Sequence, residues 1–239
     1  MRDDWRDPPA DDRPLVAVVD YGAGNLVSID QALTAVGARV QLVRDGSDLP
    51  EAELLVVPGV GAAAPAMERL ERGRLVGPIV EWIRAGRPYL GICLGLQLLF
   101  EGSDEDGAET LGILPGRTVK LRNAPTLPHI GWNQVERRRD HALFAGITDA
   151  ADFYFVHSYA GVPTGDDGEA AILAETEHGD RFVSAVAREN VLGVQFHPER
   201  SGGNGLRLLA NLVRWSVALS AGATMGALPI GAGGTRGGD

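Results

Sequence analysis

The only cysteine in the 239-residue chain, Cys93, lies between two glycines in the stretch Gly91-Ile92-Cys93-Leu94-Gly95. This G-x-C-x-G pattern matches the nucleophile elbow G-x-S-x-G with sulfur in place of oxygen. An elbow holds its nucleophile on a sharp, strained strand-to-helix turn, where larger side chains at the two glycine positions would collide with neighbouring elements. A cysteine at the beginning of a helix also meets free N–H groups, which favour its thiolate. The pattern therefore predicts a nucleophilic cysteine.

A thiolate nucleophile needs a base, usually histidine, that a third group orients. The chain has five histidines. His197 follows an apolar run and precedes Pro198 and Glu199. In extended backbone, residues i and i+2 share a face, so we expect Glu199 to fix the His197 tautomer while the other ring nitrogen faces Cys93. The sequence thus predicts a Cys93–His197–Glu199 triad.

The other four histidines have no such setting. We expect His141 and His178, which lie in polar turns, to be solvated, and His129 and His157 to have structural roles. No two histidines have the spacing of zinc ligands, and Cys93 is assigned to the elbow. We therefore predict neither a metal site nor a cofactor.

The elements that would position these residues alternate between strand and helix through the first half of the chain. Continuous apolar runs predict strands buried on both faces, over residues 15–19, 39–43, 53–57 and 89–92. Helical spacing of apolar residues predicts helices over residues 26–36, 67–85 and 94–100, the second interrupted at Gly73 or at Gly77-Pro78. This order requires a largely parallel sheet with right-handed crossovers.

The pattern changes after Gly116, where short strands alternate with turn residues. We predict strands over residues 118–121, 131–136, 152–157, 170–175, 181–187 and 192–196, which suggests an antiparallel extension of the sheet. A final helix over residues 204–219 closes the domain. The predicted fold class is α/β, with a mixed, largely parallel central sheet flanked by helices and an antiparallel extension.

Two glycine-rich turns follow predicted strands. The turn Pro58-Gly59-Val60-Gly61 exposes backbone N–H groups at the carboxyl edge of the sheet, where open α/β sheets bind ligands. The turn at residues 20–25 ends in Asn25, which can cap the next helix. A dinucleotide fingerprint would need glycine where the chain has Val27, so we interpret this second turn as a tight turn only.

Composition limits the classes of protein to consider. A net charge of −10 argues against nucleic-acid binding, which requires clustered lysine and arginine. The chain shows neither a signal peptide nor an apolar run of membrane-spanning length, so we expect a cytoplasmic protein. Residues 1–13 and 220–239 have too few core-forming side chains to order themselves, and we predict one domain over residues 14–219 with a disordered tail at each end.

The stretch GICLGLQLLF together with FHPE resembles the class I (triad) glutamine amidotransferases. Within that class, five further segments look like the glutaminase subunits of imidazole glycerol phosphate synthase: DYGAGN (20–25), PGVGA (58–62), PHIGWN (128–133), YFVHSYA (154–160) and GVQFHPERSG (193–202). The likeness spans nearly all of residues 14–219. It implies a mixed sheet flanked by helices.

The resemblance also implies a reaction. Cys93 would attack the side-chain amide of glutamine, His197 would accept the thiol proton and pass it to the departing ammonia, and Glu199 would orient His197. By the same resemblance, N–H groups of Val60 and Leu94 form the oxyanion hole. The glutamine would be bound by Gly59, Gln97, Glu105, Ser158 and Tyr159.

The family delivers its ammonia to a (β/α)8-barrel cyclase subunit, which makes imidazole glycerol phosphate in histidine biosynthesis. The resemblance places Asn25, Trp132 and Arg200 on the face that docks this heterodimer partner. The chain departs from the family at Leu96, where methionine is usual, and at Arg200, where lysine is common. Two alternatives stay open: the glutaminase of another pathway such as anthranilate synthesis, which typically has histidine at the Leu96 position, and a stand-alone cysteine hydrolase of γ-glutamyl compounds.

Overall fold

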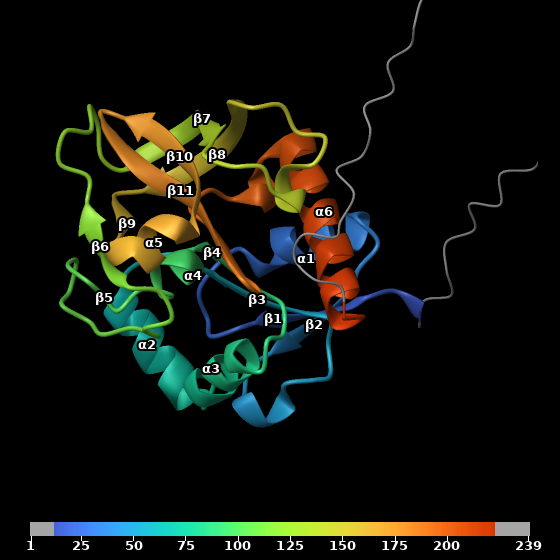
Figure 1. The fold of residues 1–239 in the computed structure, drawn as a ribbon. Helices are drawn as coiled ribbons and strands as arrows, with labels where there is room; N and C mark the ends of the chain where they lie inside the picture. The colour runs from blue at the N-terminus through green and yellow to red at the C-terminus, as the bar shows by residue number, and fades with distance from the viewer. Residues whose placement is uncertain (1–11, 223–239) are drawn as a thin grey trace, which may run out of the picture.

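The structure is a computed structural model that describes residues 12–222 (Figure 1). In that part of the chain nine strands form one mixed sheet, in the order β2-β1-β3-β4-β12-β11-β10-β7-β8. The predictions for residues 1–11 and 223–239 lie outside the described residues. None of the helices within residues 12–222 is both long enough and apolar enough to span a bilayer.

Five neighbouring strands of this sheet run parallel: β2 (Arg39–Val43), β1 (Leu15–Val19), β3 (Leu54–Gly59), β4 (Tyr89–Cys93) and β12 (Val191–Val194). The remaining four are antiparallel to their neighbours: β11 (Asp180–Arg188), β10 (Ile172–His178), β7 (His129–Arg137) and β8 (Ala151–His157). The predicted α/β fold with a mixed, largely parallel sheet and an antiparallel extension is confirmed.

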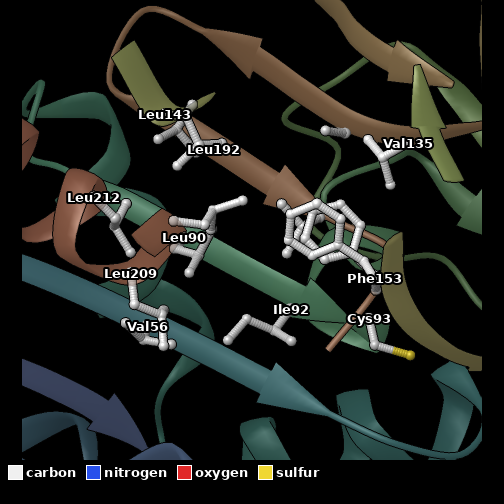
Figure 2. Close-up of a cluster of buried hydrophobic side chains, with 14 of the residues drawn as sticks. Val56, Leu90, Ile92, Cys93, Val135, Leu143, Phe153, Leu192, Leu209 and Leu212 are labelled. Carbon is white, nitrogen blue, oxygen red and sulfur yellow. The ribbon is translucent and has the colours of Figure 1, made fainter. Parts of the chain in front are cut away.

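Helices cover both faces of the parallel strands. Alternate residues of one strand point to opposite faces, so Val16 and Val18 pack toward α1 (Leu26–Ala35) and α6 (Gly202–Ser220). Ala17 and Val19 pack toward α2 (Ala63–Arg72) and α3 (Val76–Arg84). Figure 2 shows the first of these cores, in which Leu209 and Leu212 of α6 lie over Val56 and Leu90, with Cys93 at its edge. Two hydrophobic cores therefore fix the sheet on which Cys93 lies.

The antiparallel half differs from the prediction in three places. The segment predicted at residues 118–121 is β6 (Gly116–Lys120), which belongs to a separate three-stranded sheet with β5 (Gly102–Ser103) and β9 (Tyr159–Pro163). Strand β12 is parallel to β4, and its four buried residues suit its central position in the sheet. A short helix, α5 (Gly165–Ala171), precedes β10 and was not predicted.

Two helical segments differ from their predicted bounds. The segment predicted at residues 67–85 consists of α2, which begins earlier at Ala63, and α3, with the break at Gly73, one of the two positions expected. The elbow helix α4 covers only Leu94–Gln97 and does not reach Phe100. The residues that follow it, Leu98 to Phe100, are completely buried, so burial rather than helical amphipathicity explains their leucine spacing.

His141 is not solvated, so the prediction for it is wrong. The ring caps the 3-10 helix Ala142–Phe144, where its Nδ1 accepts a hydrogen bond of 3.1 Å from the Leu143 N–H. Burial, with a smaller effect from Arg139, lowers the pKa of His141 to about 4. His178 is also in contact with protein, since its ring stacks on His129 with centroids 3.9 Å apart. The apolar neighbours of these turns cannot be recognised from local sequence.

We predict that His141 makes the fold sensitive to mild acid. The unfolded state binds a proton near pH 6.5 but the native state only near pH 4, so stability is lost as pH falls through this window, by about 3 kcal/mol at most. His141→Asn keeps a capping acceptor and removes the titrating ring. The melting temperature should fall less between pH 7 and pH 4.5 in this variant than in the wild type. Equal falls would contradict the prediction.

Candidate active site

Cys93 ends β4 in a strained backbone conformation. Its φ of 53° lies in the left-handed region, which residues other than glycine adopt rarely. The two flanking glycines are tightly enclosed: a Cβ on Gly91 would overlap the Gly95 carbonyl, and a Cβ on Gly95 would overlap the Val57 carbonyl of β3. The elbow predicted from the glycines is therefore present, and both glycines are needed for the close approach of α4 to the sheet.

His197 and Glu199 form the predicted pair. The His197 Nδ1 atom lies 2.8 Å from Glu199 Oε1, and both side chains are buried. The backbone differs from the prediction, because β12 ends at Val194 and Pro198–Arg200 form a 3-10 helix instead of an extended segment. The His197 N–H donates to the Tyr154 carbonyl at 2.8 Å, which fixes the position of the ring against β8.

The charge state of His197 depends on its neighbours. Burial alone would lower its pKa, but the nearby Cys93 sulfur and the hydrogen-bonded Glu199 carboxylate outweigh burial and raise the pKa to about 10. Within residues 12–222 the His197 Nε2 atom is buried and has no hydrogen-bond partner. Glu199 thus occupies one ring nitrogen of His197, and the other is not bonded to a described protein group.

The sulfur opens into a small cavity of about 220 Å³. Six residues that the sequence assigned to the site line it: Val60, Cys93, Gln97, Glu105, Ser158 and Tyr159. Gly59 pairs with Cys93 across β3 and β4, and Leu94 begins α4, so both lie beside the cavity. The volume is below the 300–1,000 Å³ typical of sites for drug-sized ligands, which indicates a small molecule.

Two polar groups of the cavity have defined surroundings. The Gln97 Nε2 atom donates to the Tyr159 carbonyl at 2.8 Å. Glu105 is largely exposed, and partial burial together with the charge of Asp106 raises its pKa. A cationic group of a ligand would offset both effects at Glu105.

Five further residues line the cavity that were not predicted to do so: Gly61, Ala62, Pro128, Val156 and His157. The motifs PGVGA, PHIGWN and YFVHSYA contain all five and were the available signal. PHIGWN enters β7 and YFVHSYA runs from β8 into β9, and β7 pairs with β8 so that His129 lies opposite His157.

His157, which also lines the cavity, is poorly suited to act as a base. Its Nδ1 lies 2.9 Å from the Tyr159 carbonyl, which can only accept, so Nδ1 carries the proton. Its Nε2 then accepts from His129 Nδ1 at 3.2 Å. Burial lowers the pKa of His157 to about 3, so the ring is neutral and its lone pair is occupied. The structural roles expected for His129 and His157 are confirmed.

Comparisons with known proteins agree with this geometry. Residues 17–214 match the protein family described as glutamine amidotransferase class-I. The chain is 46% identical over 199 residues to imidazole glycerol phosphate synthase subunit HisH of Aquifex aeolicus, covering 82% of this chain and 95% of that protein. It is 48% identical over 203 residues to the subunit of the same name from Thermococcus kodakarensis, covering 84% of this chain and 100% of that protein. The chain belongs to the HisH family of class-I glutamine amidotransferases.

Solved structures of more distant proteins share the fold. PurLQS of Thermotoga maritima aligns with the amidotransferase at a TM-score of 0.68 and 18% identity, over 85% of this chain and 99% of that one. A glutamine amidotransferase of the same organism aligns at a TM-score of 0.57 and 18% identity, over 88% of this chain and 86% of that one. The predicted family and fold class are confirmed, and the amidotransferase is an enzyme, as predicted.

The three residues assigned to a docking face lie on three elements. Trp132 on β7 is 56% exposed and meets Tyr154 edge-on, with ring centroids 6.1 Å apart. The Arg200 guanidinium lies over the other ring of this pair, 4.1 Å from the Tyr154 centroid. Asn25 caps α1 by accepting from the Ser28 N–H at 3.3 Å, and α1 packs against the 3-10 helix that contains Arg200. Tyr154 thus joins Trp132 and Arg200, a link the sequence did not reveal.

We predict that Gly95→Ala destabilises the amidotransferase, because the new methyl group meets a backbone carbonyl that cannot move aside. Overpacking of this kind costs about 1–3 kcal/mol. Gly77→Ala is the matched control, since a Cβ there has no atom within 4 Å and lies in helix α3. The control should gain up to about 1 kcal/mol. Urea unfolding measures both, and equal stabilities would show that the elbow has no steric requirement for glycine.

Proposed function

We propose that the amidotransferase hydrolyses glutamine to glutamate and ammonia and supplies the ammonia to a (β/α)8-barrel cyclase that makes imidazole glycerol phosphate in histidine biosynthesis. The observation that carries the proposal is the strained Cys93 at the wall of a small cavity, beside the buried His197–Glu199 pair. The relatives with 46–48% identity are named as subunits of imidazole glycerol phosphate synthase.

The triad performs two linked proton transfers. The Cys93 thiolate attacks the side-chain amide carbon of glutamine, and the His197 imidazolium gives its proton to the departing ammonia. Water then attacks the thioester carbonyl, His197 takes a proton from the water, and the carbon–sulfur bond breaks to release glutamate and the thiolate. Glu199 stabilises the imidazolium and fixes its tautomer, because its carboxylate lies 2.8 Å from Nδ1.

Two backbone N–H groups hold the tetrahedral oxyanion in this proposal. Leu94 is the first residue of α4, and the first N–H groups of a helix have no partner within it. Val60 follows β3 directly and precedes Gly61, whose φ of 95° turns the loop back over the cavity. One such donor is worth about 10²–10³ in rate.

The remaining cavity residues hold the glutamine. The Glu105 carboxylate binds the α-ammonium group, which agrees with its raised pKa in the absence of a cation. Gln97, Gly59 and the backbone at Ser158 and Tyr159 position the rest of the substrate. The side-chain amide of glutamine then reaches Cys93, which lies at the cavity wall with Gln97.

The partner docks on a face that includes Asn25, Trp132 and Arg200. Ile130 and Trp132, two residues apart on β7, are 61% and 56% exposed, and large exposed apolar residues that lie together mark interaction sites. A stand-alone γ-glutamyl hydrolase would have no need of this face. The docking face therefore favours a heterodimer.

We predict that Cys93→Ala abolishes glutamate release, because the loss of a triad nucleophile costs on the order of 10⁴ or more in turnover. The fold, followed by circular dichroism, should not change. In the same assay series, His197→Ala should slow alkylation of Cys93 by iodoacetamide more than Glu199→Gln does, since His197 itself stabilises the thiolate. Retention of more than a few per cent of turnover in Cys93→Ala would remove Cys93 from this role.

We predict that Trp132→Ala weakens association with the barrel cyclase by about 30-fold or more, as expected of an interfacial tryptophan. Leu42→Ala is the matched control, because Leu42 is also exposed but lies on β2 at the opposite edge of the sheet. Association is measured by titration calorimetry with the purified cyclase.

Glutamate release in the same samples tests the link to the partner. The isolated chain should be weakly active and should gain about a hundredfold with the cyclase and its nucleotide ligand, if docking completes the oxyanion hole. Full activity in isolation would favour the stand-alone hydrolase.

A further inference from the structure

A glutamine that the triad does not include touches the reactive sulfur. Gln195 follows β12 and is completely buried. Its backbone N–H donates to the Ser184 carbonyl of β11 at 2.9 Å, which fixes its position in the sheet. Its side-chain Nε2 lies 3.5 Å from Cys93 Sγ, within hydrogen-bond range for sulfur. A buried amide at this position needs a reason, because desolvating it has a cost that only good partners offset.

The direction of the Gln195 amide follows from its partners. The Tyr159 carbonyl can only accept, so the Gln97 atom 2.8 Å away must be Nε2. The same nitrogen lies 3.1 Å from Gln195, so the Gln195 atom that faces it must be Oε1. The Gln195 NH₂ group is thereby directed at Cys93 Sγ. A chain of hydrogen bonds thus begins at a fixed backbone carbonyl and ends at the nucleophile.

We propose that Gln195 is a further catalytic residue, which donates an N–H to the Cys93 thiolate and connects the sulfur to Gln97 at the cavity wall. The proposal rests on the proposed role of Cys93 as the nucleophile. Gln195 differs from His197 in one respect that matters chemically. An amide N–H stabilises the thiolate but cannot transfer its proton to it, whereas His197 can protonate the sulfur.

This donor acts on the states in which the sulfur carries charge. The sulfur is anionic before it attacks the amide, is neutral in the thioester, and is anionic again when water expels it. A donor to the thiolate therefore favours the expulsion step. Stabilisation also reduces the nucleophilicity of the thiolate, but with a Brønsted coefficient of about 0.4–0.5 this loss is at most about half of the stabilisation. The hydrogen bond also limits the directions in which the sulfur can move.

The experiment measures the rate of Cys93 alkylation by iodoacetamide against pH, on the full chain without substrate or partner. Gln195→Met keeps the size of the side chain and removes the donor. Loss of a hydrogen bond to the Cys93 thiolate favours the protonated thiol. The midpoint of the alkylation profile should therefore move to higher pH by about one unit. Ser184→Ala is the matched control: this side chain is equally buried on the neighbouring strand, and its Oγ has no partner within the described residues. The control should leave the midpoint unchanged.

A second variant keeps the proposal testable if Gln195→Met does not fold. Gln195→Leu also removes the donor with a side chain of similar size, and no new titrating group enters the site, so the midpoint should again move upward by about one unit. Among the described residues, the other titratable groups beside Cys93 or on the cavity wall with it are Tyr21, Glu105, His157, Tyr159 and His197, and no variant alters them. An unchanged midpoint in every folded Gln195 variant would overturn the proposal.

Turnover provides an independent readout. With the partner present, Gln195→Met should lose about tenfold or more in kcat for glutamine, beyond any loss in Ser184→Ala. A loss of kcat that accompanies an unchanged alkylation midpoint would assign Gln195 a packing role only. The alkylation profile does not depend on glutamine hydrolysis, so failure of the proposed function and failure of this inference can be distinguished.

Discussion

The contact between Gly95 and the Val57 carbonyl is the constraint on which the site depends. No side chain fits between α4 and β3 at this point, so the backbone of the elbow can lie directly on the sheet. Cys93 must then adopt a φ of 53°, which costs energy that the surrounding packing has to offset. The two hydrophobic cores on either face of the sheet supply that packing. The close approach of α4 to the sheet and the strained backbone of Cys93 thus have the same cause.

Two buried histidines, His157 and His197, have pKa values shifted in opposite directions. Burial lowers the pKa of His157 to about 3, because its hydrogen-bond partners are a carbonyl and another imidazole. It would do the same to His197, but a carboxylate and a sulfur lie beside that ring and raise its pKa to about 10. His157 ends β8 and lines the cavity, whereas His197 lies in the segment after β12. Only His197 has the charged partners that suit the proposed role of acid and base.

Sequence patterns predicted the parts of the fold that depend on local signals. The apolar runs at β1 and β2 gave the observed bounds, and Asn25 caps α1 as expected. Long-range contacts were not accessible in this way. The parallel pairing of β12 with β4 and the contact of the Gln195 amide with the Cys93 sulfur both join residues distant in the chain. Motif resemblance located the triad, but the geometry of its surroundings required the structure.

The parallel pairing of β12 with β4 explains why Cys93 and His197, the proposed nucleophile and base, lie near each other. Parallel neighbours end at the same edge of a sheet, and Val194 of β12 lies opposite Ile92 of β4. Cys93 is the next residue on one strand, while Gln195 and His197 follow on the other. An antiparallel β12 would have placed His197 at the far edge of the sheet, about four residues or 13 Å away. The strand that was predicted with the wrong direction is therefore the one whose direction assembles the site.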